Sequence, residues 1–291
     1  MSPAHRTTLP ILAVLGSIAS LCVGTSLAKH LFPVIGAPAT TLLRVGFAAI
    51  LMLAVQRPWR SWPAPRALGL VLAYGVVLGA MNLSFYLALR TIPFGIAVAI
   101  EFTGPLAVAL LSSRRALDFL WIGFAVAGLA LLVPRDSLDA ALDPAGVGFS
   151  LVAALCWALY IVLGQRAGQA AGSATVPLGL VVATAVVLPF GVGEVGAVFA
   201  APALLAFAAG VALLSSAIPY SLEIYALRRL PRQTFGILLS LEPAVAALAG
   251  WLLLAEALTT PQWLAIACIM VASAGAALAA RRRPVAMPVD G

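Results

Sequence analysis

Long apolar runs separated by short polar breaks dominate this chain of 291 residues. A helix needs about 20 apolar residues to cross the hydrocarbon core of a bilayer. Hydrophobic residues make up 63% of the sequence and charged residues only 9%, too few to cover a water-soluble globule. The sequence therefore predicts an all-α integral membrane protein. We expect about ten transmembrane helices, at residues 9–32, 38–55, 67–89, 94–111, 119–133, 145–163, 176–190, 203–222, 234–254 and 262–280.

The basic residues predict the orientation of these spans. Of the 17 Lys and Arg residues, 13 fall on one side of the membrane, Lys29, Arg90 and Arg135 fall on the other, and Arg44 lies inside a span. Cytoplasmic loops carry an excess of Lys and Arg, so both termini are expected to be cytoplasmic. The net charge of +7 is spread over short loops, which favours a lipid bilayer as partner and argues against nucleic acid.

A short segment of the chain occurs twice. The segment that begins Phe-Gly-Ile at Phe94 and ends at Glu101 recurs from Phe235 to Glu242. Five helices per repeat is an odd number, so the second repeat enters the membrane from the opposite side, as in many transporters. We expect a first repeat of five helices at 9–133, a second, inverted repeat at 145–280, and a cytoplasmic tail at 281–291.

Each repeat places one carboxylate inside a span. Glu101 lies near the middle of the fourth span, and Glu242 occupies the matching position in the ninth. Such residues are costly in lipid and usually mark ion or substrate pathways, so we expect Glu101 to bind substrate and both acids to take part in proton coupling. Pro105 removes the amide that would bond to the Glu101 carbonyl, which predicts a kink and an exposed backbone acceptor there. Alternatively both acids are structural, or Glu242 closes a gate.

Two cations are candidates for the opposite charge of a substrate. Arg44 can offer a forked guanidinium to a carboxylate, and Lys29 is the only lysine of the chain. Either side chain could instead extend to the outer headgroups. Asn82 and Tyr86, four residues apart on one helix face, and Trp157 are further candidate substrate-binding residues, although an aromatic residue in a span is more often packing.

Metal and enzyme chemistry are not indicated. Cys22, Cys156 and Cys268 lie in separate apolar runs without metal-ligand spacing, and no catalytic constellation is recognisable. We therefore expect neither a cofactor nor a metal, and no enzymatic activity. A membrane-embedded enzyme and a non-transporting scaffold stay open as less favoured alternatives, and the uncharged fifth and tenth spans are candidates for homo-oligomer contacts.

Several stretches resemble the bacterial threonine/homoserine exporters of the EamA branch of the drug/metabolite transporter (DMT) superfamily. They are Ser26-Leu-Ala-Lys-His-Leu-Phe-Pro, Gly36-Ala-Pro, Gly95-Ile-Ala-Val-Ala-Ile-Glu-Phe-Thr-Gly-Pro, Cys156-Trp-Ala-Leu-Tyr, Gly164-Gln-Arg-Ala-Gly and Pro219-Tyr-Ser-Leu-Glu. The resemblance covers almost the whole chain. It implies a ten-helix inverted-repeat basket in the bacterial inner membrane and export of small neutral amino acids in exchange for protons.

Residues and resemblance together predict proton-coupled export of a zwitterionic amino acid by alternating access. Glu101 would bind the ammonium when ionised and take a proton in the return step. Arg44 would hold the carboxylate, while Asn82 and Tyr86 would contact the side-chain hydroxyl. The alternative is a DMT-type exporter of another metabolite or drug, although Arg44 would repel a cationic cargo.

Overall fold

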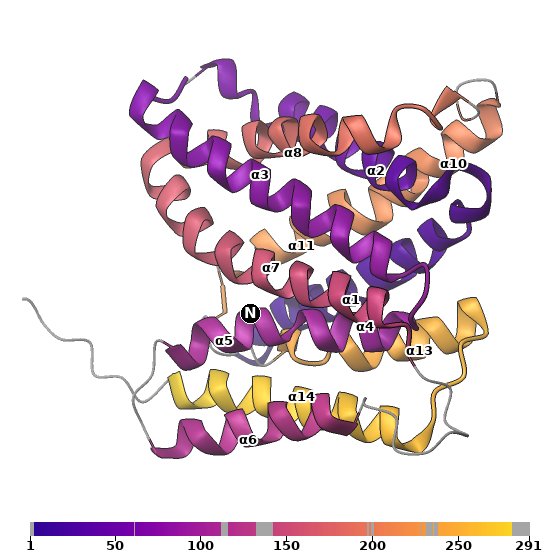
Figure 1. The fold of residues 1–291 in the computed structure, drawn as a ribbon. Coiled ribbons are helices and arrows are strands. Elements are labelled where there is room, and N and C mark those ends of the chain that lie inside the picture. The colour runs from indigo at the N-terminus through magenta and orange to yellow at the C-terminus, as the bar shows by residue number, and fades with distance from the viewer. Residues whose placement is uncertain are drawn as a thin grey trace, which may run out of the picture.

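The computed structural model describes residues 3–60, 62–111, 116–131, 142–196, 198, 201–227, 229–230, 235 and 238–280. Every regular element in these ranges is helical (Figure 1). A helix satisfies its own backbone hydrogen bonds, which lipid cannot do. The predicted all-α membrane fold is confirmed, and each predicted span overlaps at least one helix.

In chain order the longer helices are α1 (Pro3–Lys29), α2 (Phe32–Gln56), α3 (Pro65–Ala88), α4 (Phe94–Glu101), α5 (Thr103–Leu111), α6 (Ala116–Leu131), α7 (Pro144–Ala171), α8 (Thr175–Gly191), α10 (Pro202–Ala212), α11 (Ile218–Leu227), α13 (Glu242–Leu254) and α14 (Thr260–Ala280). Three short turns join them: η1 (Pro58–Arg60), η2 (Gly172–Ala174) and the π-helical turn η3 (Leu213–Ala217).

Among the described residues, four apolar segments are long enough to cross a bilayer by length and composition alone. They are Leu9–Lys29, Phe32–Gln56, Pro65–Ala88 and the nearly continuous segment Pro144–Gly191. Other apolar helices are shorter, and several of them follow one another directly, as α10, η3 and α11 do.

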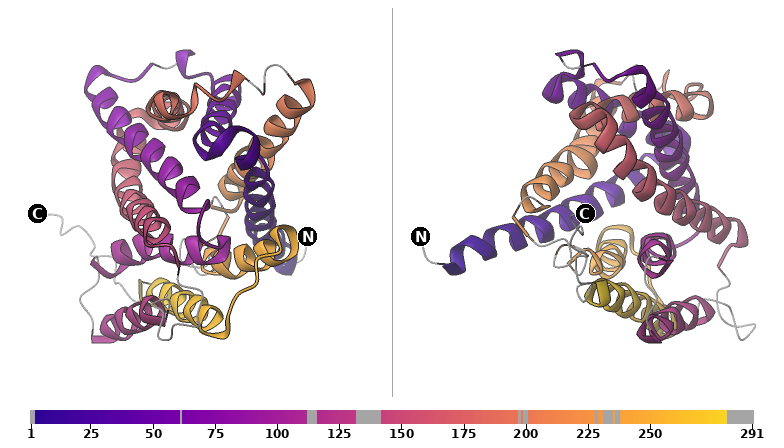
Figure 2. Two further views of the ribbon diagram at one scale, coloured as in Figure 1. Left: turned by 45° about the vertical axis from the view of Figure 1, so that its right-hand side comes forward. Right: turned by 90° about the vertical axis from the view of Figure 1, so that its left-hand side faces the viewer.

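The helices form a bundle with a distinct pair on one side. In the larger part α3 packs along α7, α8 packs against α2 and α3, and α1 lies along α11. The pair consists of α6 and α14, which run side by side at the bottom of Figure 1. Helices α4, α5 and α13 lie between this pair and the rest, as both views in Figure 2 show. The two halves of the broken helix α4–α5 are therefore central.

The surface of the bundle is largely apolar. Large side chains such as Ile50, Leu72, Phe119, Leu155 and Leu252 are exposed. A soluble protein would bury most of them, whereas a membrane protein turns them toward lipid. Polar groups are found inside instead, and those buried include Ser17, Thr25, Arg44, Asn82 and Glu101.

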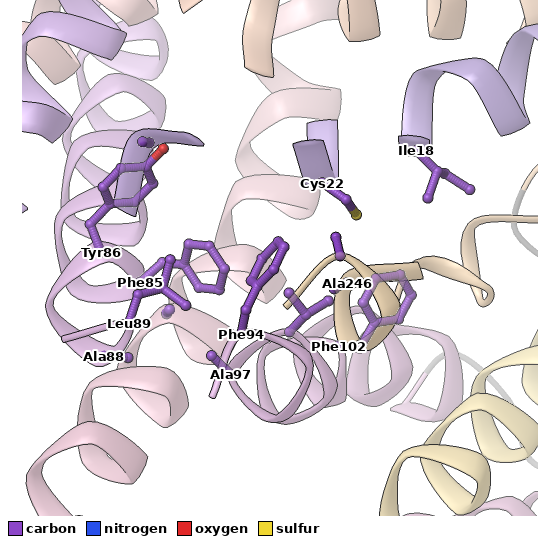
Figure 3. Packing of buried hydrophobic residues seen from close by; sticks show 14 of the residues in the cluster. Ile18, Cys22, Phe85, Tyr86, Ala88, Leu89, Phe94, Ala97, Phe102 and Ala246 are labelled. Carbon is purple, nitrogen blue, oxygen red and sulfur yellow. The ribbon is translucent and has the colours of Figure 1, made fainter. Parts of the chain in front are cut away.

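The main core lies where α1, α3, α4 and α13 meet. Figure 3 shows Cys22 from α1, Phe85 from α3, Phe94 from α4 and Ala246 from α13 gathered there. The backbones of α4 and α13 approach closely, because a Cβ at Gly95 would lie only 2.6 Å from the Ala247 Cα. Small residues thus allow α4, which ends at Glu101, and α13, which begins at Glu242, to cross in contact.

Some helix boundaries differ from the sequence prediction. The sixth span was predicted to end at residue 163, but α7 continues to Ala171. Gln165, Arg166 and Gln169 are good helix formers, so the helix extends beyond its apolar part. The second helix starts earlier than predicted and bends at Gly36, whose φ of 72° a side chain would disfavour.

Candidate functional site

Arg44 on α2 is anchored inside the bundle by two other helices. Its Nη1 donates to Asn82 Oδ1 at 2.8 Å, its Nε to Ser215 Oγ at 3.0 Å, and its Nη2 to the Ser215 carbonyl at 3.2 Å. Its side chain is 8% exposed. An unpaired arginine would be strongly disfavoured in lipid, and these bonds supply acceptors for its charge.

The Ser215 carbonyl is available because of a proline four residues later. In an α-helix this oxygen would accept from the amide of residue 219, but Pro219 has none. The backbone adopts the π-helical turn η3, in which the Ile218 amide bonds to the Leu213 carbonyl. The Leu214 carbonyl accepts a hydrogen bond from Ser20 Oγ of α1 at 2.7 Å. Such π turns inside helices are frequent at functional sites.

Asn82 and Tyr86, which their spacing places on one face of α3, both face Arg44. The Asn82 amide is engaged on both sides, since its Oδ1 accepts from Arg44 and its Nδ2 donates to the Leu78 carbonyl at 2.8 Å. Tyr86 is fully buried, and the Arg44 guanidinium carbon lies 5.3 Å from its ring centroid. In Figure 3 its hydroxyl points away from Phe85.

The Tyr86 hydroxyl has no hydrogen-bond partner among the described residues. Thr25 and Arg44 lie beside it. The bonds from Arg44 to Asn82 and Ser215 use three of the five N–H groups that a guanidinium carries, leaving one on each terminal nitrogen. The Tyr86 hydroxyl and ring lie beside these remaining N–H groups.

Glu101 lies at the break in the fourth span. Helix α4 ends at Glu101 and α5 begins at Thr103, so the helix is interrupted where Pro105 predicted a kink. The Thr103 hydroxyl donates to the Ile100 carbonyl at 2.6 Å, filling an acceptor at the interruption. Glu101 is 8% exposed. Broken helices whose ends flank a carboxylate are typical of transporter binding sites.

Glu242 is the first residue of α13 and is partly buried. Its charge interacts with that of Glu101, and Glu101 also interacts with the charge of Arg44. The two repeat-related glutamates and Arg44 therefore form one electrostatic group, although they come from α4, α13 and α2.

Trp157 and Lys29 occupy different surroundings. The Trp157 ring packs edge-on against Phe102, with centroids 5.0 Å apart, so it borders the residue next to Glu101. Lys29 forms an ion pair with Glu256, whose other carboxylate oxygen accepts from the Phe94 amide at 2.7 Å. Lys29 thus joins the ends of α1, α4 and α13 and is not part of the Arg44 group.

Comparison with known proteins identifies the family. The family model described as the EamA-like transporter family matches residues 144–278. The threonine/homoserine exporter RhtA of Salmonella typhimurium strain SL1344 is 47% identical over 282 residues, covering 97% of this chain and 96% of the relative. The chain belongs to the EamA-like transporter family. The protein of the same name from Escherichia coli K12 is 46% identical with the same coverage.

A solved structure described simply as a crystal structure of a protein supports the fold of this EamA-like transporter. It covers 97% of this chain and 99% of its own, with a TM-score of 0.50 and 18% sequence identity. At that identity the likeness concerns the fold alone. The family match together with the helical fold makes the chain an all-α membrane protein of the DMT type.

Three contacts in this EamA-like transporter were not predicted. The first is the Ser215 carbonyl, for which Pro219 was the available signal. The second is Glu256, which follows a helix end and pairs with Lys29 across 227 residues of sequence. The third is the contact of Ser17 with Glu223 at 2.8 Å, which no local pattern indicates. Within the described residues no group of three His, Cys, Asp or Glu side chains could hold a metal ion.

Proposed function

We propose that this protein exports small neutral amino acids of the threonine and homoserine type across the bacterial inner membrane, by proton antiport with alternating access. Its relatives are named threonine/homoserine exporters and are similar along nearly the whole chain. The observation that supports the cargo most directly is the buried Arg44, which keeps two N–H groups for a carboxylate.

The site offers both charges that a zwitterion requires. Arg44 holds the substrate carboxylate, and Glu101 holds the ammonium group when ionised. The unpaired Tyr86 hydroxyl can bond to a side-chain hydroxyl, and Trp157 borders the same region through Phe102. Asn82 has a positioning role, because both ends of its amide are engaged with Arg44 and the backbone.

Proton coupling follows from exclusive use of Glu101. A proton on this carboxylate removes the charge that binds the ammonium, so substrate and proton occupy the site in turn. Glu242, the repeat-related acid at the start of α13, shares in this proton coupling. Rocking of two inverted repeats, 9–133 and 145–280, would expose the site alternately. Both termini and the tail 281–291 lie in the cytoplasm.

Labelled threonine flux in proteoliposomes tests this function. We expect an inward flux that increases with an imposed pH gradient and is reduced by excess unlabelled threonine or homoserine. Glu101→Gln removes the charge and keeps the shape, and should abolish gradient-driven flux. Arg44→Met should raise the KM for threonine, whereas Arg166→Met on the exposed part of α7 should not. Gradient-driven flux that survives in Glu101→Gln would refute the role of this acid.

A further inference from the structure

Glu223 on α11 is a third carboxylate inside the bundle, and the proposed function does not use it. It is partly buried, and its Oε1 accepts from the hydroxyl of Ser17 at 2.8 Å. Ser17 belongs to α1, which packs along α11, and is fully buried. An acid inside a membrane protein is costly unless it is protonated or hydrogen-bonded. Acids retained in such places usually mark ion or substrate pathways.

The Ser17 hydroxyl has two acceptors, although it carries one proton. Besides Glu223 Oε1, it lies 3.2 Å from the Pro219 carbonyl oxygen. When Glu223 is ionised, Ser17 can donate to the carboxylate. When Glu223 is protonated, the acid can donate to Ser17 Oγ while Ser17 donates to the Pro219 carbonyl. Rotation of one hydroxyl therefore satisfies both protonation states without movement of the backbone.

Glu223 is connected electrostatically with the two glutamates of the site. Glu242 interacts with the charge of Glu223, and Glu101 interacts with that of Glu242. From α7, Tyr160 also interacts with the charge of Glu223. The cation Arg229, beyond the end of α11, is turned onto the ring of Tyr225, 3.9 Å from its centroid. Helix α1, which holds Glu223 through Ser17, packs against both α11 and α13, the helix that begins at Glu242, so the two acids border the same helix.

We propose that Glu223, positioned by Ser17, is the proton-carrying group between Glu242 and the cytoplasm. In this step the O–H bond of protonated Glu242 breaks, an O–H bond forms on Glu223, and Glu223 later releases the proton to water. Every transfer moves one proton and no electrons. The inference rests on the proposed proton antiport, because Glu223 has no such task in an uncoupled exchanger.

Two assays on the same proteoliposomes test the inference. The first is exchange of labelled for unlabelled threonine without a gradient, and the second is threonine flux driven by a pH gradient. Glu223→Gln should retain exchange and lose stimulation by the gradient. Ser17→Ala should weaken the stimulation, and Ser17→Thr, which restores a hydroxyl, should recover it. Glu194→Gln, a change in an exposed loop, should resemble the parent protein.

The outcomes separate this inference from the proposed function. Absence of gradient stimulation in the parent protein would contradict the proposed antiport. Stimulation in the parent and equally in Glu223→Gln would overturn the role of Glu223. Loss of both exchange and stimulation in a folded Glu223→Gln protein would assign the residue a structural role and also overturn it. If Glu223→Gln does not fold, an unchanged gradient response in Ser17→Ala would be the refuting result.

Discussion

Gly24 allows α1 to pack against the π turn that anchors Arg44. A Cβ at this position would lie 2.6 Å from the Ser215 nitrogen and 2.9 Å from the Leu214 carbonyl carbon. Both are backbone atoms and cannot rotate away. Since nonbonded atoms prefer about 3.5 Å, α1 would have to retreat by about 0.9 Å. Gly24→Ala should therefore disturb stability and the site together.

The magnitude can be estimated from two opposing effects. Overpacking typically costs about 1–3 kcal/mol, whereas replacing Gly by Ala in a helix gains about 0.4–1 kcal/mol through the unfolded chain. Subtracting the middle of the second range from the middle of the first, Gly24→Ala should lower stability by about 1 kcal/mol. Gly16→Ala on the same helix is the matched control, because its Cβ would meet only Leu222 Cδ1, at an ordinary 3.6 Å.

Thermal unfolding of the purified protein in detergent measures the difference. One kcal/mol corresponds to a shift of about 2–4 °C in Tm for a chain of comparable size. We expect a lower Tm for Gly24→Ala, an equal or higher Tm for Gly16→Ala, and a smaller stabilisation by threonine in the first variant. Equal Tm values for the two variants would refute the close contact between α1 and η3.

Three further predictions concern charged residues. Arg44→Lys keeps the charge but cannot bond to Asn82 and to both Ser215 acceptors. Each lost charged bond is worth about 1.5–3 kcal/mol, so the threonine KM measured in exchange should rise at least ~10-fold. An unchanged KM would contradict this. Asp143 caps α7, and its pKa is lowered by bonds from Thr91 and the Ala145 and Gly146 amides, so its stabilising effect is present above the unfolded pKa of about 3.9 and lost as pH falls through the lower folded pKa. The Tm deficit of Asp143→Ala should accordingly be larger at pH 7 than below pH 4, and equal deficits would argue against the cap. Lys29→Met leaves Glu256 without its cation and should lower the free energy of unfolding by about 1–3 kcal/mol. Adding Glu256→Gln to this variant should recover part of the lost Tm. No recovery would show that loss of the ion pair does not cause the destabilisation.

The fold could be predicted from the sequence because its main determinant is one-dimensional. Apolar runs of spanning length and the charge of the breaks depend on composition along the chain, not on tertiary contacts. A kink at Glu101 was equally accessible, since Pro105 acts on the carbonyl four residues before it. The extension of α7 to Ala171 was missed because the prediction followed hydropathy and ignored the helix propensity of Gln165 and Arg166.

The site could be predicted only in part. The spacing of Asn82 and Tyr86 on one helix face is a local property, and both residues do face Arg44. Which cation lies in the site is a tertiary property. Arg44 and Lys29 were both candidates in the sequence, but Lys29 bonds to Glu256 from the other half of the chain. The partner of Glu223 was inaccessible for the same reason, because Ser17 lies 206 residues away.

The bond from Arg44 to the Ser215 carbonyl has a consequence for variation in this protein. A backbone acceptor is present whatever side chain occupies position 215, so Ser215→Ala removes one of two bonds and leaves the other. The carbonyl is free to accept because Pro219 has no amide. Pro219 therefore supports Arg44 without bonding to it. Drift at position 215 can thus be tolerated, whereas a residue with an amide at position 219 would compete for the same oxygen. Truncation of the Ser215 side chain alone would therefore understate how much this residue holds the arginine.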